Sequence, residues 1–299
     1  MNKPVWIASL IFLVVISTIS VRAQSRIDCG AMHSKILKHP VRYCVYLPES
    51  YDASATKKPA QHYPVLYFLH GLGGNEQTLF DSGGWTLLDD LRRKRQIGEF
   101  LIVAPDGGRS FYINSADGLV RYSDFFLQEF LPYIEGKYRV ATGRPNRAIS
   151  GVSMGGYGAL RLAFSHPELF NSVSAQSAAL ITESPKEIDA SIRSGEPLAK
   201  VLADVFGNPI DVAHWRENNP FVLARENAAG LRRLAIYFNC GQEDNYGFEK
   251  GAAALHAELQ KEHVKHEYRA YPGDHSAEYF LSHFDEVIEF HSKAFALTP

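Results

Sequence analysis

The chain has 299 residues, of which 45% are hydrophobic and 21% are charged, and its formal net charge is −2. This is ordinary globular material, long enough for one large α/β domain or two smaller ones. The basic residues are scattered, and the densest run, Arg92-Arg93-Lys94-Arg95, is typical of a solvated helix end, so no nucleic-acid partner is expected.

The first 23 residues have the pattern of a secretory signal peptide. A basic start at Lys3 is followed by an apolar run from Val5 to Ile19, and Val21-Arg22-Ala23 places small residues three and one before a cut after Ala23. The apolar run is short for a membrane span, which favours cleavage over an anchor. The mature chain, residues 24–299, would carry a charge of −2 − 2 = −4, because Lys3 and Arg22 are removed. The sequence therefore predicts a periplasmic or secreted protein without a stable membrane span.

Three cysteines follow, at positions 29, 44 and 240, so at least one stays unpaired within the chain. Cys29 and Cys44 could form a disulfide in an exported protein. If they lie on one hairpin that turns near Lys38-His39, however, Cys29 is opposite about residue 48, and this register does not favour the bridge. Cys240 is expected to be a small buried apolar residue.

Short apolar runs alternate with segments of helical periodicity along the mature chain. Arg42 to Pro48 alternates like a strand and closes a hairpin. Further strands are predicted at 65–69, 100–104, 148–152, 172–175, 235–239 and 267–271, and helical segments at 122–138, 157–165, 251–262 and 277–295. Strand and helix in series predict an α/β fold, with a mostly parallel sheet covered by helices on both faces.

One segment interrupts this alternation. Residues 181–234 contain no clear strand, only short polar helices. An insertion of this size between two core strands usually packs over the carboxyl edge of the sheet, where such folds bind ligands. We expect a lid-like insertion within one domain.

The sequence Gly151-Val152-Ser153-Met154-Gly155 lies between a predicted strand and a predicted helix. A Gly-x-Ser-x-Gly motif in this position is typical of a nucleophile elbow, whose tight turn leaves almost no space for side chains two residues before and after the serine. The alternative is a small-residue turn with a capping serine. We favour Ser153 as a nucleophile.

A serine nucleophile needs a base and an orienting acid, which in this fold follow in the order acid, then histidine. His275 is the only one of the twelve histidines that follows a strand, a glycine-containing turn and a loop acid. Asp244 is favoured over Glu243 as the acid. Asp274 ranks lower, because it adjoins the histidine and would not easily reach the far ring nitrogen.

Acyl transfer also needs amide donors for the oxyanion. One is expected after the nucleophile, at Met154, and the other in the glycine-rich loop after the strand at 65–69. That loop reads His70-Gly71-Leu72-Gly73-Gly74, and Leu72 is the predicted donor.

Taken together, these motifs resemble the esterase D-like branch of the α/β-hydrolases, which includes S-formylglutathione hydrolases, feruloyl and acetylxylan esterases, and mycolyltransferases. The resemblance rests on segments 45–48, 67–74, 105–107, 151–156, 240–244 and 273–275. It implies an α/β-hydrolase fold and a serine carboxylesterase with the triad Ser153, Asp244 and His275, and oxyanion donors Leu72 and Met154. It also implies a substrate-lining loop at 106–115, with Phe111 and Tyr112 as walls, although core aromatics are an equal reading for both.

The expected substrates are small-molecule or carbohydrate esters, such as short acyl, acetyl-sugar or feruloyl-type esters. An export signal disfavours the cytosolic S-formylglutathione role. An acyltransferase that uses the same acyl-enzyme is the main alternative, and a non-catalytic binding protein of the same fold is the weakest. No motif for a metal or a cofactor competes with the triad, so neither is expected.

Overall fold

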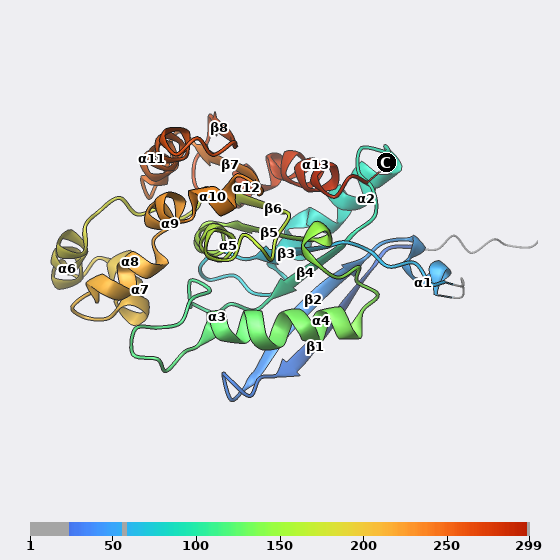
Figure 1. The fold of residues 1–299 in the computed structure, drawn as a ribbon, viewed down its shortest axis with the longest axis horizontal. Helices are drawn as coiled ribbons and strands as arrows, with labels where there is room; N and C mark the ends of the chain where they lie inside the picture. The colour runs from blue at the N-terminus through green and yellow to red at the C-terminus, as the bar shows by residue number, and fades with distance from the viewer. Residues whose placement is uncertain (1–23, 56–58, 298–299) are drawn as a thin grey trace, which may run out of the picture.

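A computed structural model describes residues 24–55 and 59–297 (Figure 1). The expected signal peptide at 1–23 lies outside the described residues. Eight strands form one sheet in the order β1-β2-β4-β3-β5-β6-β7-β8. Their bounds are β1 (Arg26–His33), β2 (Pro40–Leu47), β3 (Val65–Leu69), β4 (Leu101–Pro105), β5 (Arg147–Val152), β6 (Ser172–Gln176), β7 (Ala235–Gly241) and β8 (Glu267–Tyr271).

The sheet is parallel from β4 to β8, and β2 runs antiparallel to both β1 and β4. The central strands β3, β4 and β6 are buried along their whole length. This explains why they appear in the sequence as continuous short runs dominated by apolar and small residues, because a parallel strand is covered on both faces. The predicted mostly parallel sheet is confirmed, and the predicted hairpin forms its antiparallel edge.

Helices cover the two faces of the sheet and bury two separate cores. Along β3, Tyr67 faces the larger core, whereas Leu66 and Phe68 face the smaller one, as the period of two in a strand requires. The larger core packs against α3 (Tyr122–Phe125), α4 (Leu131–Lys137), α5 (Met154–Ser165) and α11 (Phe248–Lys261), and the smaller against α2 (Trp85–Arg93) and α13 (Phe284–Ala294).

Further short elements complete the described chain. A π-helical turn at Phe126–Phe130 joins α3 to α4, so that the predicted helix at 122–138 is one nearly continuous segment. The predicted helix at 277–295 is divided at His283. The remaining elements are α1 (Ser50–Ser54), a π-helical turn at Phe80–Gly84, a 3-10 turn at Arg144–Asn146 and α12 (Ala277–Ser282).

The segment predicted as an insertion contains five short helices and no strand. Its first helix begins with a capping box, in which Ser184 and Glu187 each bond the other's backbone amide, and it ends at Gly195 in a left-handed conformation. Figure 1 shows α6, α7 and α8 grouped to one side of α5. The five helices are α6 (Pro185–Ser194), α7 (Pro197–Phe206), α8 (Val212–Asn218), α9 (Pro220–Glu226) and α10 (Ala228–Leu231).

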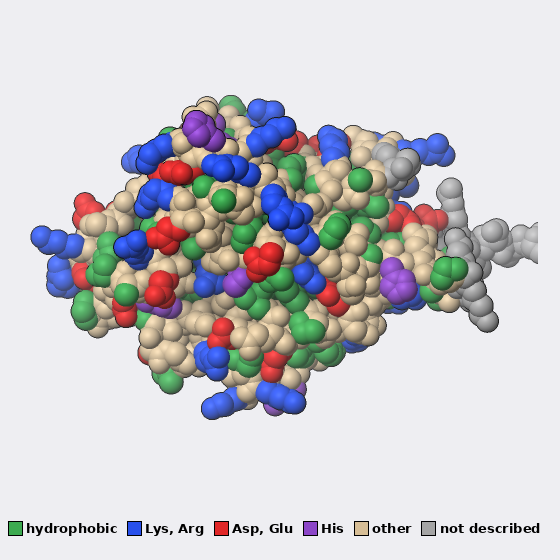
Figure 2. Space-filling view, viewed as in Figure 1, with side chains coloured by type: hydrophobic (Ala, Val, Ile, Leu, Met, Phe, Trp, Pro, Cys, Tyr) green, Lys and Arg blue, Asp and Glu red, His purple; other side chains and the backbone are tan. Residues whose placement is uncertain are grey.

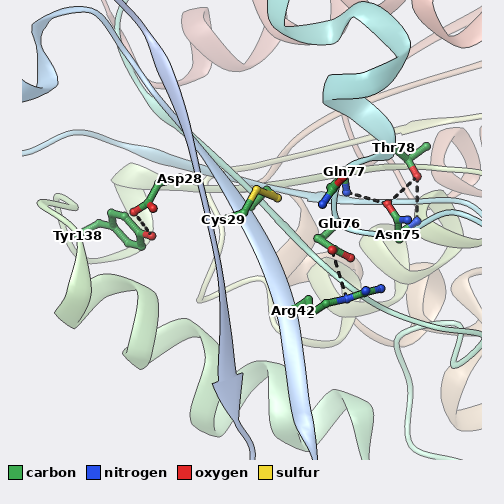
Figure 3. Close-up of a disulfide and its surroundings, with 9 residues drawn as sticks. Asp28, Cys29, Arg42, Asn75, Glu76, Gln77, Thr78 and Tyr138 are labelled. Atoms are coloured by element: carbon green, nitrogen blue, oxygen red, sulfur yellow. Dashed lines mark hydrogen bonds and ion pairs between the residues drawn. A yellow bond between two sulfur atoms is a disulfide. The ribbon is translucent and has the colours of Figure 1, made fainter.

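The register expected for the N-terminal hairpin is wrong. Cys29 lies directly opposite Cys44, because the chain turns through residues 34–39 instead of tightly at Lys38-His39. The two sulfurs form a disulfide between β1 and β2 (Figure 3). Cys240 is free and buried, and burial raises the pKa of its thiol to about 12.

The described surface carries both signs of charge. Figure 2 shows Lys, Arg, Asp and Glu side chains interspersed on the face in view. Among the described residues, no helix is long and apolar enough to cross a membrane. The expectation that this protein binds no nucleic acid stays a prediction.

Candidate active site

The turn between β5 and α5 has the geometry of a nucleophile elbow. Ser153 has φ 54° and ψ −119°, a strained conformation for a residue with a side chain. A Cβ on Gly155 would lie 2.0 Å from the carbonyl oxygen of Leu69, and one on Gly151 would lie 2.3 Å from the carbonyl oxygen of Gly155. Both glycines are therefore required sterically, because β3 and α5 pass too close to the turn for any side chain.

The structure brings Ser153, His275 and Asp244 together from three loops at the carboxyl ends of strands. Nε2 of His275 lies 2.9 Å from Oγ of Ser153, and Nδ1 lies 2.7 Å from Oδ2 of Asp244. With a proton on Nδ1, the ring donates to the carboxylate and Nε2 can accept the serine proton. The side chains of His275 and Asp244 are 8% and 0% exposed, so this pair works largely out of water.

The carboxyl group of Asp244 stays ionised in this buried position. Burial opposes its ionisation, but the hydrogen bond and charge of His275 and the amides of Tyr246 and Phe248 outweigh this effect and lower its pKa below the ordinary value. The carboxylate of the preceding residue, Glu243, makes a different contact. Glu243 accepts from the amide of Gly273 at 2.6 Å and so ties together the two loops that carry Asp244 and His275.

Three aromatic rings enclose the imidazole of His275. Tyr246, Phe248 and Phe280 each meet it edge to face, at ring-centroid distances of 4.8, 5.4 and 5.2 Å. Such contacts fix the plane of the ring. Sequence reasoning did not identify these residues, although two aromatics that closely follow a candidate acid were a usable signal.

Two backbone segments meet at the nucleophile where an oxyanion would form. Met154 is the first residue of α5, so its amide has no acceptor within the helix. On the other side, a Cβ on Gly71 would lie 3.3 Å from Cβ of Ser153, and Leu72 follows with 41% of its surface exposed. The loop predicted to supply the second donor therefore lies against Ser153.

A buried histidine holds this loop in place. The ring of His70 is 1% exposed. Its Nδ1 lies 2.8 Å from the carbonyl oxygen of Gly71, and its Nε2 accepts from the amide of Gly107 at 2.8 Å. This pattern places the proton of a neutral ring on Nδ1. The sequence indicates His70 only as part of a motif. In the structure, its ring joins the loops after β3 and β4.

An ion pair supports the same loop from the hairpin. Glu76 is buried, and one of its oxygens lies 3.3 Å from Nε of Arg42 on β2 (Figure 3). The guanidinium of Arg42 also lies 3.3 Å from Asp106, just after β4. The hairpin that carries the disulfide is thereby linked to both loops that His70 joins.

In this structure Phe111 and Tyr112 do not line an open site. Both are core aromatics, which was the alternative expectation for them. Both are 0% exposed, and both have positive φ, 51° and 58°. This backbone turns the two side chains inward, where Phe111 packs against Tyr157 and the hydroxyl of Tyr112 donates to the carbonyl of His70 at 3.0 Å. The loop at 106–115 does line a hollow of about 270 Å³, but through other residues, including Ser110 and Ile113.

The close packing of Tyr112 explains two further glycines. A Cβ on Gly107 would lie 2.3 Å from the ring of Tyr112, and one on Gly158 would lie 2.7 Å from it. The ring is therefore held between the loop after β4 and the first turns of α5. Its hydroxyl lies against the loop at residues 70–74, which we call the oxyanion loop. Tyr112 is therefore an interior residue bonded to the loop that follows β3.

Among residues 24–55 and 59–297, no group of three or more His, Cys, Asp or Glu side chains could hold a metal ion. The chemistry available at this site is that of an activated serine hydroxyl beside backbone amides, which suits attack on a carbonyl carbon.

Comparisons with known proteins match this chain to esterases. The family model described as "Putative esterase" matches residues 34–290. Esterase Rv1288 of Mycobacterium tuberculosis (strain H37Rv) is 29% identical over 248 residues, which are 77% of this chain and 51% of that protein. The chain thus spans about half the length of this curated relative. An acetyl esterase of Caldicellulosiruptor saccharolyticus is 25% identical over 87% of this chain and 96% of its own length.

A solved structure extends the agreement to the fold. A ferulic acid esterase superposes with a TM-score of 0.76 at 29% identity, covering 91% of this chain and 99% of that one. The family match spans the turn that carries Ser153, the glycine-rich loop after β3 and the loops of Asp244 and His275. The chain belongs to this esterase family of the α/β-hydrolases.

Proposed function

We propose that this protein is a serine carboxylesterase that hydrolyses esters through an acyl-enzyme. The observation that carries the proposal is the continuous chain of contacts from Oγ of Ser153 through the ring of His275 to the carboxylate of Asp244, at 2.9 and 2.7 Å. A serine hydroxyl becomes an effective nucleophile only when a base accepts its proton, and this arrangement supplies an oriented base.

The reaction proceeds in two halves. His275 takes the proton of Ser153 as Oγ attacks the ester carbonyl, and the oxyanion forms beside the amides of Met154 and Leu72. His275 then gives this proton to the leaving alcohol oxygen, and the C–O bond breaks to leave the acyl-enzyme. In the second half a water molecule takes the place of the alcohol, and hydrolysis restores Ser153.

The substrates that we propose are short acyl or feruloyl-type esters. Support comes from the names of two relatives, an acetyl esterase and a ferulic acid esterase, each covered nearly end to end by the match. Purified protein should release p-nitrophenol from p-nitrophenyl acetate. Adding a sugar acceptor at a fixed donor concentration would reveal any acyl transfer as a sugar ester beside the free acid.

The decisive variant is Ser153→Ala. Removing the nucleophile removes the covalent route, so kcat should fall by about a thousandfold or more. Ser177→Ala is the matched control, because it alters a buried serine, the residue that follows the neighbouring strand β6. A fluorophosphonate probe should label Ser153 in the folded wild type. Full activity in Ser153→Ala would contradict the proposal.

We also propose that the protein is exported and cleaved after Ala23. The N-terminal pattern supports this, and so does the Cys29–Cys44 disulfide, because structural disulfides persist in oxidising compartments. Intact mass and N-terminal sequencing of protein from the culture medium or periplasm test the proposal. A native protein that stays in the cytosol and begins at Met1 would overturn it.

A further inference from the structure

A half-open cavity of about 480 Å³ lies between the insertion and the loop after β7. It is separate from the hollow at the 106–115 loop. Helices α6 and α7 form one side of the cavity, and the segment at 246–250 forms the other. The lining of the cavity includes none of the triad residues.

Two walls of the cavity begin at the catalytic residues. The loop after β6 is bonded to the elbow, because the amide of Ala179 donates to the carbonyl of Ser153 at 3.0 Å, and the next residue, Leu180, lines the cavity. The opposite wall contains Tyr246 and Phe248, the rings that enclose His275. The cavity is therefore next to the Ser153–His275 pair.

The chemistry of the lining is apolar inside and polar outside. The apolar side chains, most of them buried, are those of Leu180, Ile181, Ile188, Leu198, Ala199 and Leu202. Exposed charged residues, Glu183, Glu196 and Lys250, lie at the rim. Tyr246 is 59% exposed and stacks on Phe248 at an interplanar angle of 16°, so its ring offers an open apolar face.

The position of His275 decides which part of an ester would enter. In the tetrahedral intermediate the leaving oxygen must lie within reach of Nε2 of His275, because this atom protonates it, whereas the oxyanion points to the amides of Met154 and Leu72. The group attached to the leaving oxygen therefore extends along the flank of His275. Tyr246 and Phe248 form that flank and continue into the cavity.

We propose that this cavity is a binding site for the alcohol part of the ester, and that it selects uncharged alcohols with a medium-length alkyl or arylalkyl group. The proposal rests on the proposed esterase function. The aliphatic lining favours such groups, and the rim, with two carboxylates and one ammonium group, has a net negative charge that disfavours anionic alcohols. Tyr246 is the specificity-determining residue at the entrance.

The test separates the two parts of the ester. One series holds the acetyl group constant and compares methyl, hexyl and 2-phenylethyl acetate. The other holds methanol constant and compares methyl acetate with methyl hexanoate. Each buried methylene is worth roughly three- to fourfold in kcat/KM, so burying only two methylenes of the hexyl or phenylethyl group should make these acetates exceed methyl acetate by about tenfold, and burying more should increase the ratio.

The variant Ser191→Phe fills the cavity from α6, and Tyr246→Ala removes its entrance wall. Ser191→Phe should lower kcat/KM for hexyl acetate by about tenfold and leave methyl acetate within about twofold. Tyr246→Ala also removes a ring that contacts His275, so its readout is the ratio of kcat/KM for hexyl acetate to that for methyl acetate, which should fall by about tenfold. Ala190→Phe adds the same ring at an exposed position of α6 outside the cavity and is the matched control. Thermal unfolding of all variants reports whether they fold.

Two results would overturn the proposal. A loss confined to methyl hexanoate would assign the cavity to the acyl group, and unchanged selectivity in both variants would show that no part of the ester enters it. Both are distinct from failure of the esterase function itself, in which the wild type hydrolyses no ester and Ser153 takes no fluorophosphonate.

Discussion

The hydroxyl of Tyr112 provides a sharp test of how the oxyanion loop is held. It donates to the carbonyl of His70 at 3.0 Å, in the interior of the protein, and the next two residues carry the loop past Ser153 to Leu72. Tyr112→Phe deletes only this donor and keeps the ring between Gly107 and Gly158. The carbonyl of His70 then loses its buried partner, which should lower the free energy of unfolding by about 1–3 kcal/mol.

The effect on catalysis should exceed what a general loss of stability would produce. Complete removal of one oxyanion donor lowers kcat by about 10²–10³. Tyr112→Phe loosens the segment that carries the donor without deleting it, so we expect a smaller loss, about tenfold in kcat, which corresponds to about 1.4 kcal/mol. KM should change by less than about twofold, because the lost stabilisation acts in the transition state.

Steady-state kinetics with p-nitrophenyl acetate and urea unfolding measure the two effects separately. Tyr67→Phe is the matched control, because within the described residues its buried hydroxyl has no hydrogen-bond partner, so its removal should leave kcat unchanged. If Tyr112→Phe unfolds at lower urea but keeps the kcat of the wild type, the hydroxyl stabilises the fold without positioning the oxyanion loop, and the reasoning is refuted.

Three further outcomes are expected. Asp244→Asn should lower kcat by about 10⁴, because the amide NH2 can donate to Nδ1 and so stabilise the wrong tautomer of the His275 ring. Glu243→Gln should keep most activity, and equal losses in the two variants would show that the acid is misassigned. Cys29→Ser should lower the free energy of unfolding by about 3 kcal/mol, because the disulfide closes a loop with a sequence separation of 15. Urea unfolding with and without dithiothreitol tests this, and a reductant effect on the variant as large as that on the wild type would argue against it. Burial lowers the pKa of His291, which lies between the hydroxyls of Ser172 and Ser174, to about 3. A histidine in the unfolded chain titrates near 6.5, so the stability that neutral His291 contributes to the fold is complete above pH 6.5 and is lost as the pH falls toward 3. At pH 5 the free energy of unfolding should be lower by about 2 kcal/mol. Urea unfolding at pH 7 and 5 should show a smaller difference in His291→Asn than in the wild type, and an equal difference would exclude His291 as the cause.

Much of the fold could be predicted because its signals are local. The bounds predicted for β3 and β8 coincide with those in the structure, and the other predicted strands differ by a residue or two at their ends. A parallel strand covered on both faces is a short apolar run, and it can be recognised without knowledge of its neighbours. The insertion was also predictable, since helices such as α6 carry their own capping residues.

The spacing of Gly151, Ser153 and Gly155 was equally informative, because a turn of this tightness has steric requirements that the chain must satisfy locally. The order of the loops after β7 and β8 then limited the acid and the base to a few residues. The distances that unite Asp244, His275 and Ser153 came from the sheet, because β5, β7 and β8 place their carboxyl ends at one edge.

Other features depended on tertiary structure alone. The Cys29–Cys44 pairing follows from where the hairpin turns, and a shift of the turn by two residues moves the opposite position by four. The inward direction of Tyr112 comes from positive φ at Phe111 and Tyr112. This backbone conformation is not a preference of either residue type, so the sequence does not predict it. The aromatic flank of His275 and the cavity beyond it are formed by residues far apart in the chain, from 180 to 280. The sequence by itself determined the fold class and the residues able to act, since these depend on local pattern and steric demand. Only the tertiary structure decided which side chains support them, because that depends on the distances between segments that the sheet brings together.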